Sequence, residues 1–356
     1  MFEGIYLHTE NSITIFTGIK KEKLNPDFKK YNIIYLSILN PNKKINILIN
    51  YLRMFILVLF NRDFILEQIL NKYNIDILSH SFPLGKNSKI KSIYWIPDLQ
   101  QFHLKKLFSI KKRFKRWLDI YIASKNASVI LFSSKTVRQI FLQKYPNFKR
   151  KSFVLNFLNK LPKKQPKSKL AKKFKNYFLI SNQFWIHKNY DLIIKGLIEL
   201  QKQQINPYIL STGTKFDWRS SSYYGNLLKK IKQNKLRNFI ILGKVSREEQ
   251  LGLILKANYL INPSRSEGWN SAIEEAKSLK TNVLASNLDV HKEQLGKKGI
   301  YFGCDDYLKF SYILKKEYLK KKKEKKIKYN NLYNLNKFNF KKFALYYQNI
   351  LIKINK

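Results

Sequence analysis

The sequence is short of acidic residues, arginine, alanine and glycine, and it contains one cysteine. Of its 356 residues, 69 are Lys or Arg and 23 are Asp or Glu, which gives a formal net charge of +46. Only 10 of the basic residues are arginine, alanine occurs 8 times, and asparagine occurs 34 times. AT-rich codons produce this bias, so the charge by itself is a weak indicator of function. The single Cys304 excludes an internal disulfide and fits a reducing compartment.

Long hydrophobic runs are also missing. The most apolar stretch, 47–60, has about 14 residues and includes Asn50 and Arg53, whereas a spanning helix needs roughly 20. We expect a buried or half-buried helix there, and a helix lying on a membrane surface is the alternative. Glu3 and Glu10 interrupt the N-terminus, which is not a secretory signal. The expected location is cytoplasmic, or peripheral on the inner face of the membrane.

Short apolar runs alternate with longer segments of helical periodicity. This alternation predicts parallel sheets with crossover helices, the α/β class. The expected strands are 13–16, 33–39, 75–78, 93–95, 129–132, 177–181, 207–211, 239–242, 259–262, 283–286 and 300–302. The expected helices of the first half are 44–60, 61–73, 110–125 and 134–144. Ser246 followed by Glu249 predicts a capping box at a further helix start.

The segment 159–176 is rich in lysine and contains two prolines and no acidic residue. This composition predicts a linker between two domains. We therefore expect two Rossmann-like, doubly wound domains of parallel sheet that face a cleft, formed by 1–158 and 177–338. Residues 339–356 are expected to form a final helix that packs back on the N-terminal domain. Ligands of open α/β sheets bind at the carboxyl ends of strands, and here those ends would face the cleft.

One loop combines a phosphate site with two carboxylates. An apolar strand is followed by Gly268 and a helix start near Asn270 or Ser271, where backbone N–H groups and the helix dipole favour an anion. Glu267 lies in the loop, and Glu275, eight residues later, is placed to bind two hydroxyls of a ribose. Taken alone, the two glutamates are better explained as a helix cap and a solvated surface residue.

In its wider context this loop resembles the donor-binding signature of family-4 glycosyltransferases, retaining enzymes of GT-B fold. In that family a Glu-Gly-aromatic loop leads into a helix, and a second Glu follows the first by eight positions, as at 267–275 here. The resemblance covers roughly 75–310 and keeps the family's order of motifs. The other segments that carry it are 95–100, 178–189, 211–213, 241–243 and 290–294.

The resemblance implies a role for each matching residue. Lys188 stands in the place of a diphosphate-binding lysine, and Glu267 would hold a sugar hydroxyl; with Asp98 these are the expected catalytic residues. Glu275 would bind the ribose, and Asp98 and Gln100 are expected on the acceptor side. The other expected nucleotide-sugar-binding residues are Gln183, Gly243, Lys244, Val245, Gly268, Trp269, Asn270 and Ser271.

Several positions depart from the family pattern. The Gly-Arg pair that usually precedes the lysine is Asn-Gln at 182–183, which removes one positive charge, and Arg265 is a candidate substitute. The acceptor-side His-Asp is Pro97-Asp98, and Asp98 is also explained as a turn cap. Because 13–16 resembles the family's second strand, we expect the N-terminal domain to lack the first strand and its glycine-rich loop.

The implied reaction is metal-independent, retaining transfer of a hexose from a nucleoside-diphosphate sugar to a glycan or lipid-linked acceptor, without a cofactor, in surface polysaccharide or lipopolysaccharide synthesis. The chain has no Asp-x-Asp motif, which agrees with a reaction that needs no metal. The first alternative is a degenerate, non-catalytic nucleotide-sugar-binding protein.

The basic composition suggests two other kinds of binding partner, nucleic acid and an anionic membrane. Nucleic-acid binding is not expected, since arginine, the main bidentate ligand of bases and phosphates, is scarce. The basic run 105–116, with its aromatic residues, would suit an anionic membrane surface, and a solvated helix face is the other interpretation.

Overall fold

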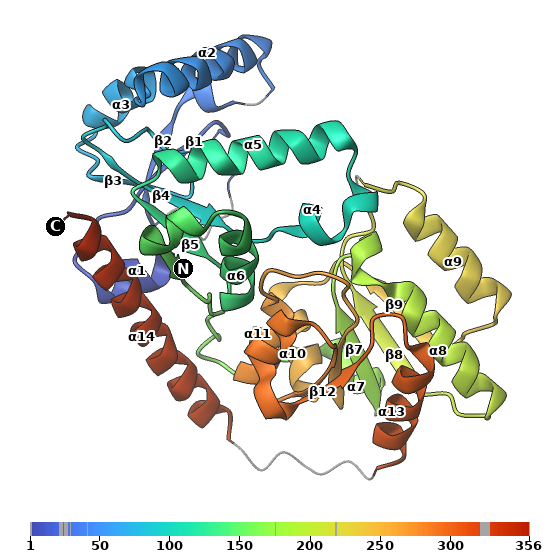
Figure 1. The fold of residues 1–356 in the computed structure, drawn as a ribbon. Coiled ribbons are helices and arrows are strands. Elements are labelled where there is room, and N and C mark those ends of the chain that lie inside the picture. The colour runs from blue at the N-terminus through green and yellow to red at the C-terminus, as the bar shows by residue number, and fades with distance from the viewer. Residues whose placement is uncertain are drawn as a thin grey trace.

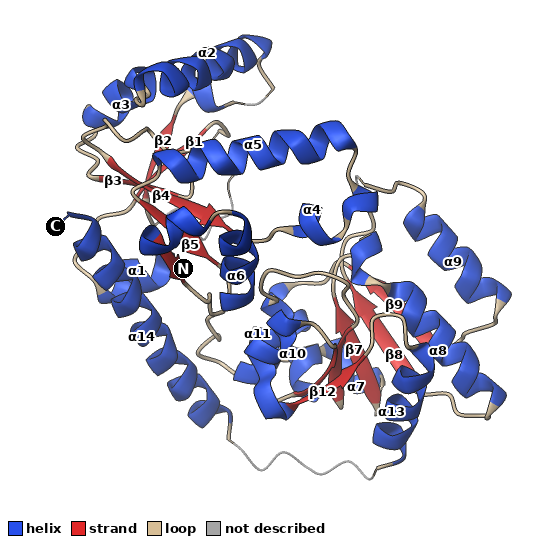
Figure 2. Cartoon of the chain, viewed as in Figure 1, coloured by secondary structure: helices blue, strands red, loops and turns tan. Residues whose placement is uncertain are grey.

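The chain folds into two α/β domains and a long C-terminal helix that runs beside both (Figure 1). This computed structural model describes residues 2–355, except 21–23, 25–27, 29, 41, 175, 218 and 321–327. All strand pairs among these described residues are parallel. The expected fold class, two Rossmann-like domains of parallel sheet, is therefore confirmed, and Figure 2 shows helices covering the sheets.

The N-terminal domain contains a two-stranded sheet, β1-β2, and a four-stranded sheet in the order β3-β4-β5-β6. Its strands are β1 (Thr14–Thr17), β2 (Asn32–Tyr35), β3 (Ile77–Ser79), β4 (Lys91–Ile96), β5 (Val129–Phe132) and β6 (Ser152–Val154). Its helices are α1 (Phe2–His8), α2 (Lys44–Phe60), α3 (Phe64–Asn71), α4 (Gln100–His103), α5 (Ile110–Asn126) and α6 (Lys135–Lys144), and its 3-10 turns are η3 (Ser37–Leu39), η4 (Lys105–Leu107) and η5 (Pro146–Lys151).

The C-terminal domain is built on a six-stranded sheet in the order β12-β11-β10-β7-β8-β9. Its strands are β7 (Tyr177–Ser181), β8 (Tyr208–Thr212), β9 (Phe239–Gly243), β10 (Tyr259–Asn262), β11 (Asn282–Ser286) and β12 (Gly299–Phe302). Its helices are α7 (Lys169–Lys173), α8 (Tyr190–Lys202), α9 (Tyr223–Gln233), α10 (Arg247–Lys256), α11 (Ser271–Ser278), α12 (Asp289–Leu295) and α13 (Tyr307–Leu319), with 3-10 turns η6 (Ile186–Lys188) and η7 (Gly296–Lys298).

The central strand β7 shows why this sheet has two cores. All five of its residues are buried, as expected of a parallel strand covered on both faces. Successive side chains of a strand point to opposite faces, so Phe178 and Ile180 pack into one cluster with α8, whereas Tyr177 and Leu179 pack into another with α10 and α11. The sheet is thereby fixed between two helical layers, and its carboxyl edge is left for loops.

Some elements begin or end at other residues than the sequence predicts, and local geometry explains the difference. The helix expected at 61–73 begins at Phe64, because Asn61 has a left-handed φ of 50° and the Asp63 side chain caps the helix by accepting from the Leu66 N–H at 3.0 Å. The strand expected at 33–39 ends at Tyr35 and continues into a 3-10 turn. The short elements α1 and β6 were not expected from the pattern.

The expected capping box forms only in part. Ser246 caps α10, since its hydroxyl accepts from the Glu249 N–H at 3.2 Å. The Glu249 carboxylate does not complete the box by accepting a hydrogen bond from Ser246. It accepts from the N–H groups of Lys169 and Leu170, each at 3.1 Å, and from the Ser168 hydroxyl. Glu249 therefore ties the start of α7, in the expected linker, to the C-terminal domain.

Helix α2 has the expected bounds, but the expected burial is wrong. Only Asn46 and Leu57 are buried, because the helix lies at the far end of the N-terminal domain (Figure 1). Nine of its apolar side chains are 50–66% exposed: Ile45, Ile47, Leu48, Tyr51, Leu52, Phe55, Val58, Leu59 and Phe60. Within the described residues no single helix is long and apolar enough to cross a membrane; α2 and α3 together pass that test by length and composition, but meet at a bend of 101°.

The last helix, α14 (Tyr329–Asn355), joins the two domains. It begins ten residues before the expected start at 339, because Tyr329 and Leu332 already pack into a core cluster of the C-terminal domain. Further along, Phe343, Tyr347 and Ile350 pack against the N-terminal sheet. Part of the lysine-rich segment between α13 and α14, 321–327, lies outside the described residues.

Candidate active site

The strand order of the C-terminal sheet creates one crevice at its carboxyl edge. From β7 the chain moves outward to β8 and β9, and it then crosses back so that β10, β11 and β12 lie on the other side of β7. Loops after β7 and β10 therefore diverge at this switch point, which is where ligands bind in such sheets. Lys188 is on the loop after β7 and Glu267 is on the loop after β10.

These two side chains meet. The Lys188 Nζ lies 2.5 Å from Glu267 Oε1, and their side chains are 10% and 8% exposed. Asn270 Nδ2 donates to the same carboxylate oxygen at 3.0 Å, while Asn270 Oδ1 caps α11 by accepting from the Ile273 N–H. The helix start expected near Asn270 or Ser271 is confirmed. A carboxylate, an ammonium and a helix N-terminus thus converge at the crevice.

The surroundings of Glu267 fix its charge. Burial alone would raise the pKa of Glu267, but the Lys188 ammonium, His187 and hydrogen bonds from Lys188 and Ser264 outweigh it and hold that pKa at about 2. Burial, with the nearby Lys188 charge, lowers the pKa of His187 to about 3. At neutral pH the site therefore contains an anionic Glu267 and a neutral His187. Glu267 is suited to accept hydroxyl hydrogen bonds and not to donate a proton.

Glu275, eight residues further, belongs to a second cluster. It is buried in α11 and forms an ion pair with Arg247 at the start of α10. Asn159 Nδ2 donates to the Glu275 carboxylate at 2.9 Å, and Gln250 Nε2 lies 3.5 Å from it. Burial raises the pKa of Glu275 although Arg247 opposes the shift. A solvated surface position is thereby excluded for Glu275.

The loops after β8 and β9 close one side of the crevice. The Gly213 N–H donates to the Gly243 carbonyl at 2.9 Å. Both glycines have positive φ, and a Cβ on Gly213 would lie 2.2 Å from the Asn182 carbonyl oxygen beside the half-buried Gln183. The other expected residues on this side, Lys244 and Val245, are exposed and half-buried on the turn that leads to Arg247.

Asp98 and Gln100 face the C-terminal domain from the end of β4. Asp98 Oδ1 accepts from the Gln100 N–H at 3.3 Å and lies 3.6 Å from Arg116 on α5. The Gln100 side chain accepts from Arg219 of the other domain at 3.1 Å. Arg219 is itself fixed by Asp217 at 3.0 Å. Asp98 is therefore a turn cap at the cleft, and Gln100 is an interdomain contact.

The two domains approach closely at the Glu-Gly-Trp loop. A Cβ on Gly268 would lie 1.7 Å from the Pro97 carbonyl oxygen, so the loop requires glycine there. Trp269 Nε1 donates to the Phe157 carbonyl at 3.0 Å. Glu293 on α12 caps the start of α6 in the other domain, accepting from Lys135 N at 2.8 Å and from Thr136 N at 3.0 Å. These contacts describe a closed arrangement.

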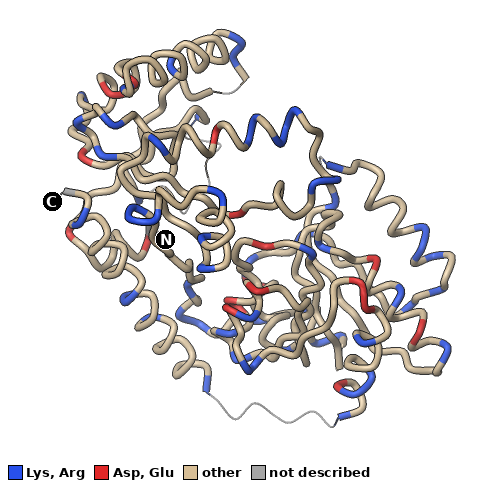
Figure 3. Tube along the Cα trace, viewed as in Figure 1, with Lys and Arg blue, Asp and Glu red and all other residues tan. Residues whose placement is uncertain are grey.

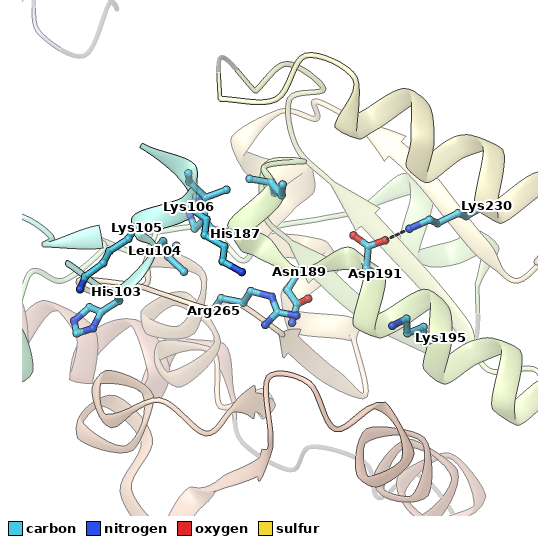
Figure 4. Close-up of a pocket in the computed structure, with 12 residues that line it drawn as sticks. His103, Leu104, Lys105, Lys106, His187, Asn189, Asp191, Lys195, Lys230 and Arg265 are labelled. Carbon is cyan, nitrogen blue, oxygen red and sulfur yellow. Dashed lines mark hydrogen bonds and ion pairs between the residues drawn. The ribbon is translucent and has the colours of Figure 1, made fainter. Parts of the chain in front are cut away.

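A cavity of about 670 Å³ lies between the domains beside this site (Figure 4). Its N-terminal wall is the turn from His103 to Leu107, and its C-terminal wall includes His187 and Arg265. Arg265 pairs with Asp305 at 2.5 Å. The remaining polar lining residues are Asn189, Asp191, Lys195 and Lys230. The cavity carries more cationic than anionic side chains, which suits an acidic or phosphate-bearing ligand.

The structure thus brings together Lys188, Glu267, Gly268 and Asn270, places Ser271 at the helix start beside them, and puts Glu275 in a neighbouring cluster. Sequence reasoning missed the residues that support these groups: Asn159, Arg219, Arg247, Gln294 and Glu293. Glu293 and Gln294 lie in the segment 290–294 that carries the resemblance, but no role was predicted for either of them. The other three belong to no local motif, because each reaches the site from a distant element, and for the two arginines the available signal was that Arg is rare in this sequence. Figure 3 shows Lys and Arg scattered along both domains.

Among the described residues, no group of three or more His, Cys, Asp or Glu is placed to hold a metal ion. Residues 162–331, which carry Lys188, Glu267 and Glu275, match the family model "Glycosyl transferases group 1". The matched region covers the C-terminal domain and somewhat less than half of the chain. The site at the β7/β10 switch point lies within this matched region.

A curated relative also has a glycosyltransferase name. The chain is 28% identical over 247 residues to the O-antigen chain mannosyltransferase RfbU of Salmonella typhimurium, a match that covers 69% of this chain. It spans 65% of the length of that curated relative. The match therefore spans somewhat less than two thirds of the Salmonella protein.

Solved glycosyltransferase structures share the fold over most of the chain, which confirms GT-B architecture. Sucrose-phosphate synthase from Thermosynechococcus elongatus superposes with a TM-score of 0.67 at 11% identity, covering 99% of this chain and 89% of its own. A glycosyltransferase from Rickettsia africae gives 0.60 at 16% identity, covering 97% and 88%. Anabaena HepE, solved with UDP and glucose, gives 0.58 at 14% identity, covering 79% and 76%.

Proposed function

We propose that this chain transfers a hexosyl group from a nucleoside-diphosphate sugar to a glycan or lipid-linked acceptor in surface polysaccharide synthesis. The observation that carries the proposal is the buried Lys188–Glu267 pair at the switch point of a group 1 glycosyl transferase domain. Mannose is the first sugar to test, because the Salmonella relative is a mannosyltransferase. Its name also supports a growing polysaccharide as acceptor.

The chemistry follows from where charge develops. Breaking the sugar–phosphate bond leaves oxocarbenium character on the sugar and negative charge on the β-phosphate. Lys188 and the N–H groups at the start of α11 would stabilise that phosphate charge electrostatically. Glu267, anionic at neutral pH, would accept hydrogen bonds from sugar hydroxyls and hold the ring in place.

Two further groups would position the donor and acceptor. Glu275 would bind the ribose by exchanging part of its Arg247 and Asn159 contacts for hydroxyl groups. The cationic cavity between η4 and α8 would receive a phosphate-bearing, lipid-linked acceptor. We also propose retention of anomeric configuration and independence from metal ions, as in the family-4 enzymes that the motifs resemble.

The test is a turnover assay on the full chain with radiolabelled guanosine- and uridine-diphosphate sugars, a lipid-linked oligosaccharide acceptor, and a chelator arm. We expect transfer from one donor, unchanged by the chelator, and loss of transfer in Glu267→Gln. The anomeric configuration of the product, read by NMR coupling constants, checks retention. Donor binding without any hydrolysis or transfer would instead support the degenerate, non-catalytic alternative, which the loss of an arginine at Gln183 favours.

A further inference from the structure

Helix α2 has its hydrophobic side toward solvent. The segment Lys44–Phe60 contains two charged residues, Lys44 and Arg53. Nine of its apolar side chains are 50–66% exposed. A helix of a soluble domain normally buries its apolar stripe and exposes its polar one. Contiguous exposed apolar surface of this kind marks an interaction site.

The polar side chains of α2 hold it to the protein. Asn46 is buried and donates to the carbonyls of Ser37 and Asn40 at 2.6 and 2.7 Å. Arg53 forms an ion pair with Asp63 at 2.8 Å, with side-chain exposures of 11% and 5%. The orientation of α2 is therefore set by internal polar contacts, and its outward apolar surface is a fixed feature of the fold.

The neighbouring part of the chain fixes how α2 can meet a partner. Helix α3 cannot follow α2 into a bilayer, because its Leu66 and Leu70 are buried in the domain core with Leu84 and Ile90. The bend of 101° between the two helices also prevents α3 from following α2 into a bilayer. Helix α2 is thus suited to lie along a surface and not to cross it.

Helix α5 of the same domain presents a basic and aromatic side. Phe114, Trp117 and Tyr121 are exposed and stack in series, with ring centroids 5.7 and 6.1 Å apart. The lysines between these aromatic residues and before them are exposed as well: Lys111, Lys112 and Lys115. Tyrosine and tryptophan favour the membrane–water interface, and lysines near an anionic leaflet each add about 1 kcal/mol.

We propose that the N-terminal domain docks on an anionic lipid bilayer, with the outward face of α2 inserted among the headgroups and the basic side of α5 against lipid phosphates. The charge argues for lipid over a second copy of this chain, since copies with a net charge of +46 repel each other and attract anionic lipid. An apolar helix face combined with basic residues is the pattern of interfacial helices.

Docking would also orient the cleft. Arg116 of α5 lies 3.6 Å from Asp98 at the cleft, and the turn that precedes α5 lines the interdomain cavity. A bilayer under α5 would place that cavity close to lipid headgroups. This consequence rests on the proposed function, whereas the docking itself does not.

The test is flotation of the full chain with vesicles of phosphatidylcholine, with and without phosphatidylglycerol. The variant Leu48→Ser with Leu52→Ser removes two exposed apolar side chains of α2 and changes no charge. Its matched control is Leu308→Ser with Tyr312→Ser on α13, which has the same spacing, with exposures of 57% and 61% against 66% and 50% for the α2 pair. We expect binding only to the anionic vesicles, weakened about tenfold or more by the α2 pair and unchanged by the control.

A second readout reports insertion directly. The difference in tryptophan emission between Phe55→Trp and the wild type, which already has five tryptophans, should be blue-shifted with anionic vesicles and quenched by brominated lipid. Equal vesicle binding by the α2 variant and wild type, or binding that the control weakens as much, would overturn the proposal. So would a dimer in solution that the α2 variant dissociates without any vesicle binding, since a second copy would then cover this face. Loss of flotation with intact transfer to a water-soluble acceptor would leave the proposed function standing.

Discussion

The Lys188 ammonium and the Glu267 carboxylate neutralise each other, 2.5 Å apart and nearly buried. Leaving either one buried alone would be costly, because an unpaired charge loses its hydration without compensation. A bound diphosphate would offer Lys188 a second anion at the same place, while sugar hydroxyls would take over part of the Glu267 hydrogen bonding. The pair therefore prepares the site for a ligand that has both groups.

Glu267→Gln tests the electrostatics of this pair by its pH dependence. The native pKa of about 2 lies below the ordinary value of 4.5, so the carboxylate stabilises the fold above 4.5 and loses that contribution as pH falls toward 2. The contribution at neutral pH is on the order of 3 kcal/mol. Urea unfolding across this range should show wild type and variant converging at acid pH. A stability difference that stays constant with pH would contradict the assignment.

Glu275→Gln tests the proposed ribose contact. Because a carboxylate bound to two hydroxyls contributes to ground-state binding, we expect about tenfold weaker donor affinity with kcat changed less. The control is Glu248→Gln, an exposed glutamate on the neighbouring helix α10. Initial-rate kinetics against donor concentration separate the two parameters. A fall in kcat at constant KM would place Glu275 in the chemical step instead.

At the scale of elements, glycine is required where the loop after β10 meets the other domain. Gly268→Ala would place a Cβ 1.7 Å from the Pro97 carbonyl oxygen, so the loop or the domain contact must move. We expect at least tenfold lower kcat/KM, because misplacing Glu267 by a fraction of an ångström weakens its contacts. Gly225→Ala is the control: no atom lies within 4 Å of its Cβ, and alanine in helix α9 should stabilise by up to about 1 kcal/mol. Equal activity of both variants would contradict the close approach.

The elements also show what the sequence could and could not predict. Helix α2 was predicted at its observed bounds, because bounds follow from local periodicity, yet its burial was wrong, because burial depends on what packs against it. The glutamate of the capping box was placed correctly on α10, but its carboxylate serves α7, 79 to 81 residues away in sequence. The Glu-Gly-Trp loop could be recognised because its residues are adjacent in the sequence. The roles of Arg219 and Glu293 could not be predicted, because both residues act across the domain interface.

At the scale of the whole molecule, the domains are joined by polar contacts such as those of Glu293 and Gln100, and by α14. Glu293→Ala would remove the carboxylate that caps the first N–H groups of α6 across the cleft. Loss of such a cap costs about 1–2 kcal/mol. At this position the loss would destabilise the closed arrangement of the two domains. We expect a larger radius of gyration by small-angle X-ray scattering and a higher KM for the donor. An unchanged scattering curve and unchanged KM would show that other contacts hold the closed form.

The central claim, that the switch point between β7 and β10 binds the diphosphate of a nucleotide sugar, is tested most directly by calorimetric titration. Nucleoside diphosphate and monophosphate are titrated into the wild type and into Lys188→Met with Glu267→Gln, which removes both charges and leaves neither unpaired. Lys202→Ala, an exposed lysine on α8, is the control. The account predicts diphosphate binding at least tenfold weaker in the double variant and monophosphate binding unchanged. Equal losses for both nucleotides, or no loss for either, would contradict it.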